Sequence, residues 1–411
     1  MANKPKIRFK GFDDAWEQRK LLSCIQSITD FRGRTPKKLG MDWSESGYLA
    51  LSALNVKDGY IDFSQDVHYG NQELYDKWMS GKELHRGQVL FTTEAPMGNV
   101  AQVPDNKGYI LSQRTIAFDV EEKILSENFL ATLLRTPNVF NDLIALSSGG
   151  TAKGVSQKSL SGLDVVIPKN IDEQNKLADY FINLDNLITL HQRKCDQMKE
   201  LKKYMLTKMF PQNGAKVPEI RFDGFIDDWE QRKLGDLVGI YDGVHQTPEY
   251  QDSGIMFLSV ENIATLKSEK YISKEAFERD YKVYPEKGDI LMTRIGDVGT
   301  TNVVETAKKV AFYVSLALLK PNGINSYFLS NAMKTNAFQK GLRERTLVTA
   351  IPQKINKDEI GKIDIFITNN DVEQQKIGAY FSTLDHLITL HQHKCNELRE
   401  IKKYMLKNMF I

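Results

Sequence analysis

The stretch that decides the fold is Glu173–Phe210, EQNKLADYFINLDNLITLHQRKCDQMKELKKYMLTKMF. It returns at Glu373–Phe410 as EQQKIGAYFSTLDHLITLHQHKCNELREIKKYMLKNMF. Of the 38 aligned positions 23 are identical, and the block LITLHQ is unchanged. Self-similarity of this kind is typical of a chain built from recurring structural units. We therefore expect two halves with a common scaffold.

Both copies have the periodicity of a long helix. In the first copy the inward positions include Phe181, Leu184, Ile188, His191 and Cys195, with spacings that alternate between three and four residues. This alternation is the heptad pattern of helices that pack along a seam. A helix of 38 residues would be roughly 57 Å long at 1.5 Å per residue. Further apolar residues are expected to widen each stripe so that it packs on both a partner helix and a globular domain: Tyr180, Leu187, Leu190, Leu201 and Tyr204.

The two helices are expected to pair with each other in antiparallel orientation. This arrangement buries both seams and relates the halves by a pseudo-twofold axis. A parallel pairing would require the second globular segment to bridge the whole helix length, so it is the less favoured alternative. Pro211, Gly214 and Pro218 end the first helix and turn the chain into its second half.

A second repeated block opens each half. Ile7–Leu21, IRFKGFDDAWEQRKL, matches Ile220–Leu234, IRFDGFIDDWEQRKL, at 12 of 15 positions. Each half therefore runs in the order opening motif, variable segment, long helix. Because Trp16 and Trp229 stand in the same context in both halves, we interpret them as hydrophobic anchors that hold the opening motif to the helices.

The variable segments, about 22–171 and 235–371, are expected to be mixed α+β domains. Short runs rich in β-branched residues, bounded by Gly, Pro and Asn, are typical of strands. The clearest of these runs are Gln88–Thr92, Asp164–Ile167 and Asp364–Ile367. The predicted fold is thus two globular α+β domains separated by two long antiparallel helices that form a coiled coil.

Composition narrows the class of protein. The chain has 411 residues, a net charge of +2 and three cysteines, so it lacks both the strong positive charge of a general nucleic-acid coating protein and a disulfide framework. The cysteine usage favours a reducing cytoplasmic setting. No run approaches the roughly 18 apolar residues needed to span a membrane, and we find none of the common phosphate-loop, zinc-protease, hydrolase or adenine-methylase motifs.

Two His/Cys pairs need weighing as a metal site. His191 with Cys195 and His391 with Cys395 each lie four residues apart on a helical face, so together they have the ligand types of a Cys2His2 zinc site. All four positions also fall on the seam, where a small Cys and a hydrogen-bonded His are ordinary core residues. We favour the core interpretation and predict no metal.

In these motifs the chain resembles the DNA specificity subunits of type I restriction-modification systems. The resemblance rests on RFKGF…WEQRKL and RFDGF…WEQRKL at the start of each domain and on VVIPKNIDEQNKLADYF…LDNLI at the end of the first. The end of the second domain, IFITNNDVEQQKIGAYF…LDHLI, departs from the first in having Thr368 where Pro168 stands. The match covers essentially the whole chain.

The resemblance implies a division into recognition domains and spacer helices. The first recognition domain is expected at 1–171 and the second at 220–371, with the opening motifs (7–21 and 220–234) included in them. The first spacer helix is expected at 172–210, a linker at 211–219 and the second spacer helix at 372–411.

The resemblance also implies a protein that catalyses nothing itself. Each recognition domain would read one half of a bipartite double-stranded DNA target, while the helices set the spacer length and dock two methyltransferase subunits. Those partners would use S-adenosylmethionine to methylate adenine at N6. Two restriction subunits that depend on ATP and Mg would join optionally as an endonuclease. A cytoplasmic protein without a cofactor of its own or a membrane partner is expected.

The candidate DNA-reading residues are polar side chains in Gly-punctuated loops, because Arg suits guanine and Gln or Asn suits adenine. In the first domain they are Arg32, Arg34, Thr35, Lys37, Thr92, Thr93, Asn99, Gln113, Arg114, Lys153, Gln157 and Lys158. In the second they are His245, Gln246, Thr247, Thr293, Arg294, Thr301, Asn302, Arg343, Arg345, Gln353 and Lys354. Such residues are also common on ordinary solvated surface.

Two other functions remain open at this point. The near-neutral charge is compatible with a non-catalytic adaptor that binds only proteins and has no DNA specificity. The His/Cys pairs are the one feature that favours an enzyme. The anchoring role of Trp16 and Trp229 has its own alternative, a platform on which bases stack, but a position that reads different half-sites should differ between the halves.

Overall fold

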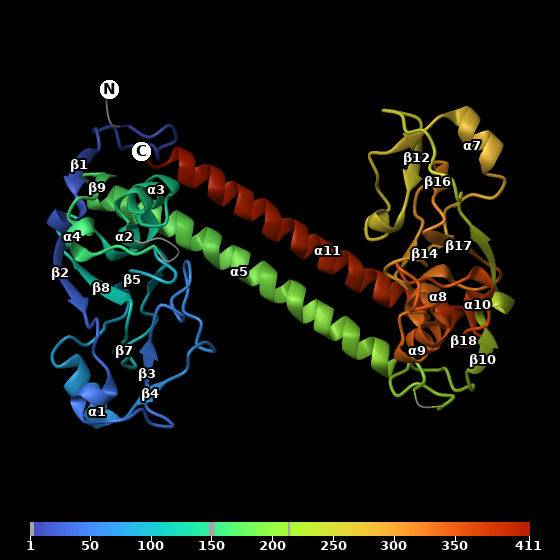
Figure 1. Cartoon of the computed structure of the whole chain (residues 1–411), viewed down its shortest axis with the longest axis horizontal. Helices are drawn as coiled ribbons and strands as arrows, with labels where there is room; N and C mark the ends of the chain where they lie inside the picture. The colour runs from blue at the N-terminus through green and yellow to red at the C-terminus, as the bar shows by residue number, and fades with distance from the viewer. Residues whose placement is uncertain (1–3, 148–152, 213) are drawn as a thin grey trace. The chain divides into compact units, whose positions relative to one another are not determined.

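The structure is a computed structural model that describes residues 4–147, 153–212 and 214–411. The chain divides into two compact units (Figure 1). Unit 1 contains the residues up to His191 together with His393–Ile411, and unit 2 contains Gln192–Gln392. Each unit therefore combines a globular segment with the beginning of one long helix and the end of the other.

Unit 1 contains two sheets and a strand pair. The strand pair joins the opening motif, β1 (Glu17–Lys20), to β9 (Asp164–Ile167) in antiparallel register. The four-stranded sheet has the order β2 (Ile25–Asp30), β8 (Thr115–Val120), β5 (Val89–Thr92), β6 (Val100–Gln102). The three-stranded sheet has the order β4 (Tyr69–Gly70), β3 (Tyr48–Leu51), β7 (Ile110–Leu111). The helices of the globular part are η1 (Leu21–Cys24), η2 (Pro36–Leu39), α1 (Gln72–Met79), α2 (Glu127–Leu133), α3 (Pro137–Leu146) and α4 (Gln157–Leu160).

Unit 2 repeats this topology. Its strand pair is β10 (Glu230–Lys233) with β18 (Asp364–Ile367). Its four-stranded sheet has the order β11 (Val238–Asp242), β17 (Leu316–Pro321), β14 (Ile290–Thr293), β15 (Thr301–Val303), and its three-stranded sheet β13 (Tyr271–Ile272), β12 (Ile255–Leu258), β16 (Val310–Phe312). Its short helices are α6 (Leu234–Leu237), η3 (Val260–Asn262), α7 (Lys274–Asp280), α8 (Ser326–Ala332), α9 (Asn336–Arg345) and α10 (Lys357–Gly361).

The four-stranded sheet of unit 1 separates two hydrophobic cores. Successive side chains of a strand point to opposite faces, so Val89 and Phe91 of β5 enter the core beside the helices, whereas Leu90 enters the core shared with the three-stranded sheet. All four β5 residues are buried. A strand buried on both faces is expected to read as a continuous apolar run rather than as an alternating one.

The two long helices are α5 (Ile171–Lys208) and α11 (Asp371–Asn408). In unit 1 the thiol of Cys395 lies 3.8 Å from the carbonyl of Ile188, and Lys402 pairs with Asp185 at 2.5 Å. Residues early in α5 thus meet residues late in α11. Unit 2 repeats the pattern, since Cys195 meets Ile388. The predicted α+β repeat with antiparallel long helices is confirmed within each unit.

The widened apolar stripe does not pack as expected. Leu187 and Leu190 are 43% and 46% exposed, and Leu201 and Tyr204 are exposed as well. Cys195 and Cys395, which lie on the seam, are fully buried. The expectation that these residues contact a globular domain is therefore wrong for Leu187, Leu190, Leu201 and Tyr204, because the seam alone covers the helix contact there. It is confirmed for Tyr180, which packs against the core of unit 1 with its ring 6.1 Å from that of Phe9.

The core of each unit is closed by the end of the helix that belongs to the other repeat. In unit 1 Phe410 stacks on Phe129 with ring centroids 5.7 Å apart and meets the edge of Trp16 at 6.1 Å. In unit 2 Phe210 stacks on Phe328 at 5.7 Å and meets Trp229 at the same distance. The residues that directly follow each long helix are therefore core residues.

This packing predicts that Phe410→Ala destabilises unit 1, while Phe210→Ala destabilises unit 2. Truncating a buried Phe typically costs about 3–5 kcal/mol because apolar contact is lost and a cavity remains. Hydrogen exchange measured by mass spectrometry should show lost protection in the unit that holds the altered ring. Equal loss in both units for either variant would contradict the assignment of each ring to its own core.

Candidate nucleic-acid interface

The sheet topology of unit 1 gathers three loops at one end of the four-stranded sheet. The last residue of β2, Asp30, pairs with Ile116, and the last residue of β5, Thr92, pairs with Thr115 at the start of β8. The loops that follow β2 and β5 and the loop that precedes β8 therefore emerge together. Most of the predicted reading residues lie on these loops.

Side-chain contacts join these loops in unit 1. Gln157 donates from Nε2 to Asp30 at 3.2 Å, and the guanidinium of Arg32 lies 3.5 Å from the same carboxylate. Gln113 donates to the backbone carbonyl of Arg34 at 3.2 Å. The side chains of Gln113, Gln157 and Arg32 are exposed around a common point, the end of β2.

A second group lies along the loop that follows β5. The guanidinium of Arg114 is 3.3 Å from the carboxylate of Glu94, and Glu94 forms a backbone bridge with Gly154. Lys153, next to that bridge, and Lys158, in α4, are exposed. The segment 153–158 thus contributes exposed cations to the same end of the unit.

Four predicted residues share a hollow of about 250 Å³: Arg34, Thr35, Lys37 and Gln113. Its walls also include Trp43 and Trp78, whose ring centroids are 5.6 Å apart. Arg34 lies over the ring of Phe31 at 4.2 Å and donates to the carbonyl of Trp78. Sequence reasoning missed both tryptophans, because no local pattern shows that they meet the loop after β2.

Three predicted residues of unit 1 have structural partners instead. Thr92 is fully buried, and its hydroxyl accepts the backbone amide of Asn99 at 2.9 Å. Asn99 donates its own amide to the carbonyl of Val56 at 2.9 Å, and the buried Thr93 lies within 3.3 Å of the carbonyl of Arg114. These side chains hold the loop that follows β5 rather than project from it.

In unit 2 a buried ion pair ties the equivalent loops together. Arg294, directly after β14, pairs with Asp242 at the end of β11 and is only 7% exposed. Burial lowers the pKa of Arg294. Thr293 has the role of Thr92, since its hydroxyl accepts the amide of Thr300 at 2.9 Å.

The exposed predicted residues of unit 2 lie in two places. His245, Gln246 and Thr247 line a cavity of about 760 Å³ after β11. Gln353 exchanges hydrogen bonds with Gly296, donating from its side chain at 3.0 Å and accepting the glycine amide on its backbone carbonyl at 2.9 Å. Lys354 is exposed beside it.

The remaining predicted residues of unit 2 are apart from this group. Thr301 is buried against Ser330 at 3.0 Å, and Asn302 donates to the carbonyl of Ile263 at 2.9 Å. Arg343 and Arg345 lie in the last turn of α9, where Arg345 donates to the carbonyl of Gly341 at 3.2 Å. Arg343 is exposed.

A buried ion pair that sequence reasoning missed positions each opening motif. Arg8 donates two hydrogen bonds to Glu173 at 2.6 and 2.8 Å, and Trp16 donates to the same carboxylate at 3.2 Å. The hydrogen bond with Glu173 raises the pKa of Arg8. Arg221 and Glu373 repeat the pair at 2.6 and 3.0 Å. The sequence could have indicated these ion pairs, because the Arg and the Glu recur at matching positions in both repeats.

Trp16 and Trp229 are buried, which confirms their interpretation as anchors.

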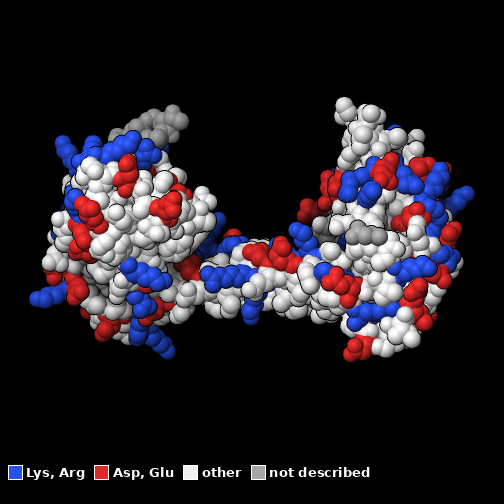
Figure 2. Space-filling model, turned by 90° about the horizontal axis from the view of Figure 1, so that it is seen from below, with Lys and Arg blue, Asp and Glu red and all other residues white. Residues whose placement is uncertain are grey.

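Charge is mixed on the visible face of each unit, where Lys and Arg are interspersed with Asp and Glu (Figure 2).

Across the described residues, no three His, Cys, Asp or Glu side chains are grouped so as to hold a metal ion. Within the same residues, none of the helices combines the length and the apolar character that crossing a membrane requires.

Two matched α+β units, each with polar loops at one end of a sheet and each closed by antiparallel helix ends, define a class of internally repeated α+β proteins with paired long helices. The family model for the type I restriction modification DNA specificity domain matches residues 14–200 and 226–400. The chain belongs to this family, and it is a type I specificity subunit with two DNA recognition domains.

The relatives agree along nearly the whole chain. It is 22% identical over 409 residues to the type I restriction enzyme MjaVIII specificity subunit of Methanocaldococcus jannaschii, covering 95% of this chain and 91% of the relative. The putative MjaX specificity subunit of the same organism is 21% identical over 428 residues, covering 98% and 95%. The crystal structure of a type I restriction-modification S subunit from M. genitalium aligns with a TM-score of 0.69 at 15% identity over 99% of each chain. The last comparison establishes the shared fold.

Substitution of the buried threonines tests whether they hold their loops in place or contact DNA bases. Thr92→Val leaves the amide of Asn99 without its partner, which typically costs about 1–3 kcal/mol for a buried donor. We expect a matching loss of stability in urea unfolding, and Thr293→Val should behave alike. Thr247→Val, at an exposed position, is the control and should leave stability unchanged. A Thr92→Val variant of full stability would mean that its hydroxyl does not hold the loop.

Proposed function

We propose that each unit reads one half of a bipartite DNA target and that the chain itself catalyses no reaction. The observation that carries this proposal is the contrast within the matched sheet ends. Thr92 and Thr293, which hold the loops, are the same in both units, whereas the exposed side chains around them differ. The loop after β2 carries Arg32 and Arg34, whereas the equivalent loop after β11 carries His245 and Gln246. Gln113, on the loop before β8, has the buried Val314 at the matching position of unit 2. Two different half-sites require such a difference on a common scaffold.

The proposed contacts fall into two kinds. Side chains with directional hydrogen bonds are assigned to base edges, and exposed cations to phosphates, since phosphate contacts set position without carrying sequence information. The base-reading set is Arg34, Gln113, Gln157, His245, Gln246, Thr247 and Gln353. The phosphate set is Arg32, Lys37, Arg114, Lys153, Lys158, Arg343, Arg345 and Lys354. Thr35, beside Arg34, stays a candidate for DNA contact. A structural role in holding the loops is assigned to the others: Thr92, Thr93, Asn99, Thr293, Arg294, Thr301 and Asn302.

The partners are proposed from the long helices. Leu187 and Leu190 in unit 1 and Leu201 and Tyr204 in unit 2 leave apolar side chains exposed on α5. Contiguous exposed apolar residues are typical of protein contact surfaces. We assign this face to two methyltransferase subunits, which would carry S-adenosylmethionine and methylate adenine at N6. Restriction subunits using ATP and Mg would join that core optionally in the cytoplasm, and the helices would set the spacer length. The domain bounds proposed above, 1–171 and 220–371, follow the same scheme.

The assignment of Gln113 and Lys37 can be tested in the complex with the methyltransferase subunits. Gln113→Ala should relax one base position in one half of the methylated motif, because a lost bidentate contact removes about 1–3 kcal/mol of discrimination. Lys37→Ala should weaken binding to all sequences and lower the slope of log affinity against log salt by about one. Base-resolution mapping of methylated adenines and fluorescence anisotropy measure the two effects.

Both side chains are exposed or at a surface hollow, so each variant should unfold like the wild type. An unchanged methylated motif in Gln113→Ala would remove this residue from the reading set. DNA affinity that is independent of salt and of sequence in the wild-type complex would favour a protein adaptor instead.

The docking face is tested by Leu187→Ser combined with Leu190→Ser. Nearly half of each side chain is exposed, so the variant should keep its melting temperature but lose co-purification with the methyltransferase subunits. Lys194→Ser, at an exposed polar position of the same helix, is the matched control and should retain the partner. Retention of the partner by the double variant would place the docking surface elsewhere.

A further inference from the structure

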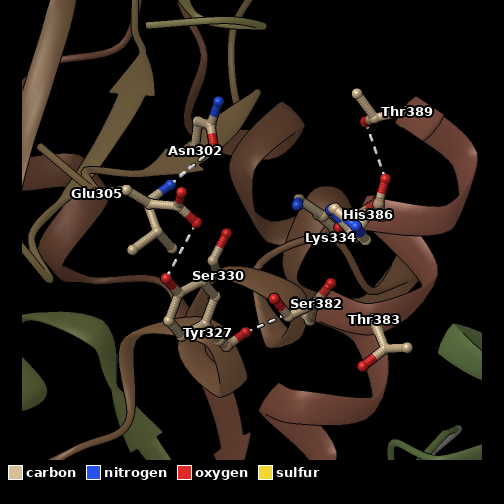
Figure 3. A pocket seen from close by; sticks show the side chains of 12 residues that line it. Asn302, Glu305, Tyr327, Ser330, Lys334, Ser382, Thr383, His386 and Thr389 are labelled. Carbon is tan, nitrogen blue, oxygen red and sulfur yellow. Dashed lines mark hydrogen bonds between the residues drawn. The ribbon is translucent and has the colours of Figure 1, made fainter. Parts of the chain in front are cut away.

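A cavity in unit 2 is lined by Lys334, whose ammonium forms no ion pair in the described part of the chain. Lys334 lies in the connection between α8 and α9 and lines two adjoining cavities of about 470 and 410 Å³. Figure 3 shows Lys334 among the side chains of the first cavity, which come from β15, α8 and α11. Lys334 is therefore a shared wall of both spaces.

The second cavity has an excess of positive charge. Lys199, Lys202 and Lys203 of α5 line it together with Lys334, and Asp385 of α11 supplies the one carboxylate among its lining residues. That carboxylate is already engaged, since Lys202 lies 2.5 Å from it. The lining residues thus include four lysines and one acidic residue. Glu305 and His386 line the first cavity from its other walls.

Lys334 itself has no partner within the described part of the chain, as its ammonium forms neither a hydrogen bond nor an ion pair there. The pKa of Lys334 is lowered to about 8, mainly by burial and in smaller part by nearby Lys202, and Asp385 offsets only part of this lowering. Burying a cation without an ion-pair partner costs free energy of folding. An anion that entered the cavity would therefore form a favourable ion pair with Lys334.

The equivalent cation of the first repeat, Arg135, has two carboxylate partners. Arg135 directly precedes the Thr that begins α3, as Lys334 directly precedes the Thr that begins α9. Arg135 is held by Asp58 at 2.5 Å and by Asp185 at 2.8 Å, and although burial lowers its pKa, these two carboxylates raise it overall.

Unit 2 keeps only one of these two carboxylates. Asp385 corresponds to Asp185, whereas aligning Ser52–Asp58 (SALNVKD) with Ser259–Thr265 (SVENIAT) places Thr265 where Asp58 stands. The second unit thus has the cation and the space but lacks the second anion.

We propose that the second cavity, called the Lys334 cavity below and lined by Lys334 and three lysines of α5, binds a phosphate group. Lysine binds phosphate as a point charge, and the cavity offers several lysines from different directions. Thr335 and Asn336, at the N-terminus of α9, line the same cavity. The Thr335 hydroxyl donates to the carbonyl of Ala332 and forms no cap. The first amides of this ten-residue helix are therefore free of a side-chain cap and suit an anion.

The phosphate has two sources with the same chemistry, a backbone phosphate of DNA or a free phosphate or diphosphate. The first source rests on the proposed function, and the second does not. The experiment therefore uses two probes on the full chain. Inorganic diphosphate binding is measured by calorimetry at constant ionic strength, and binding to a duplex without a target site is measured by anisotropy over a range of salt.

The variants are Lys334→Gln and, as a matched control, Lys340→Gln. Lys340 lies in α9 and is 75% exposed, so it tests the general loss of one charge. Lys334→Arg should retain binding. Because Lys334→Gln removes an unpaired, partly buried charge, it should not lower the melting temperature.

We expect Lys334→Gln to weaken diphosphate binding at least tenfold and Lys340→Gln to weaken it less than twofold. If Lys334→Gln also weakens duplex binding and lowers its salt slope by about one, the source is the DNA backbone. If duplex binding equals that of Lys340→Gln, the source is a free phosphate.

The proposal is overturned if the two variants do not differ with either probe. It is also overturned if a polyglutamate peptide competes as strongly as diphosphate at equal charge, since the ligand would then be a protein carboxylate. The diphosphate measurement involves no DNA. A failure of the reading function would instead appear in the Gln113 and Lys37 variants, so the two failures are distinguishable.

Discussion

The constraint on which the rest of the structure depends is that each unit completes its core with the end of the other repeat's helix. Phe410 fills the core of unit 1 and Phe210 that of unit 2, each against aromatic rings of the globular part. Large buried aromatic rings contribute much of the apolar area in a core. A unit therefore cannot reach its full stability from its own continuous segment, and the matched helix ends must stay constant while other parts vary.

This constraint separates what is constant from what is free to change. Glu173 and Glu373 fix the opening motif through Arg8 and Arg221 in the same geometry. Breaking a buried pair of this kind is costly, because it leaves a charge without compensation. Most side chains on the loops at the sheet ends are exposed and contribute little to the core. The Arg294–Asp242 pair of unit 2 and the buried Thr92 and Thr293 are exceptions, because they hold these loops in place. The repeats differ along most of their variable segments, and the exposed loops at the sheet ends, where recognition is proposed, belong to these segments.

Periodicity predicted the scaffold well and the site less well. The strands Asp164–Ile167 and Asp364–Ile367 and the antiparallel helices followed from spacing, because burial imposes a regular pattern. The role of Thr92 did not follow, since a threonine at a strand end has the same letter whether it faces a base or holds its own loop. The hollow beside Trp43 arises from segments far apart in sequence, which no local pattern joins. Similarly, the exposed face at Leu187 looked like core because apolar spacing does not say what covers it.

Arg135 and Lys334 lie neither in the repeated opening motifs and long helices nor in the loops at the sheet ends. They lie where the globular part meets the long helices, a region in which the two repeats otherwise agree in fold. In unit 1 the two carboxylates Asp58 and Asp185 balance the two cations Arg135 and Lys402. The Lys334 junction retains one carboxylate, which Lys202 already engages, and the cavity remains accessible. Electrostatic interactions are stronger in a partly buried site than in water. We therefore expect the loss of one carboxylate to give the Lys334 junction a higher affinity for an anion than the Arg135 junction.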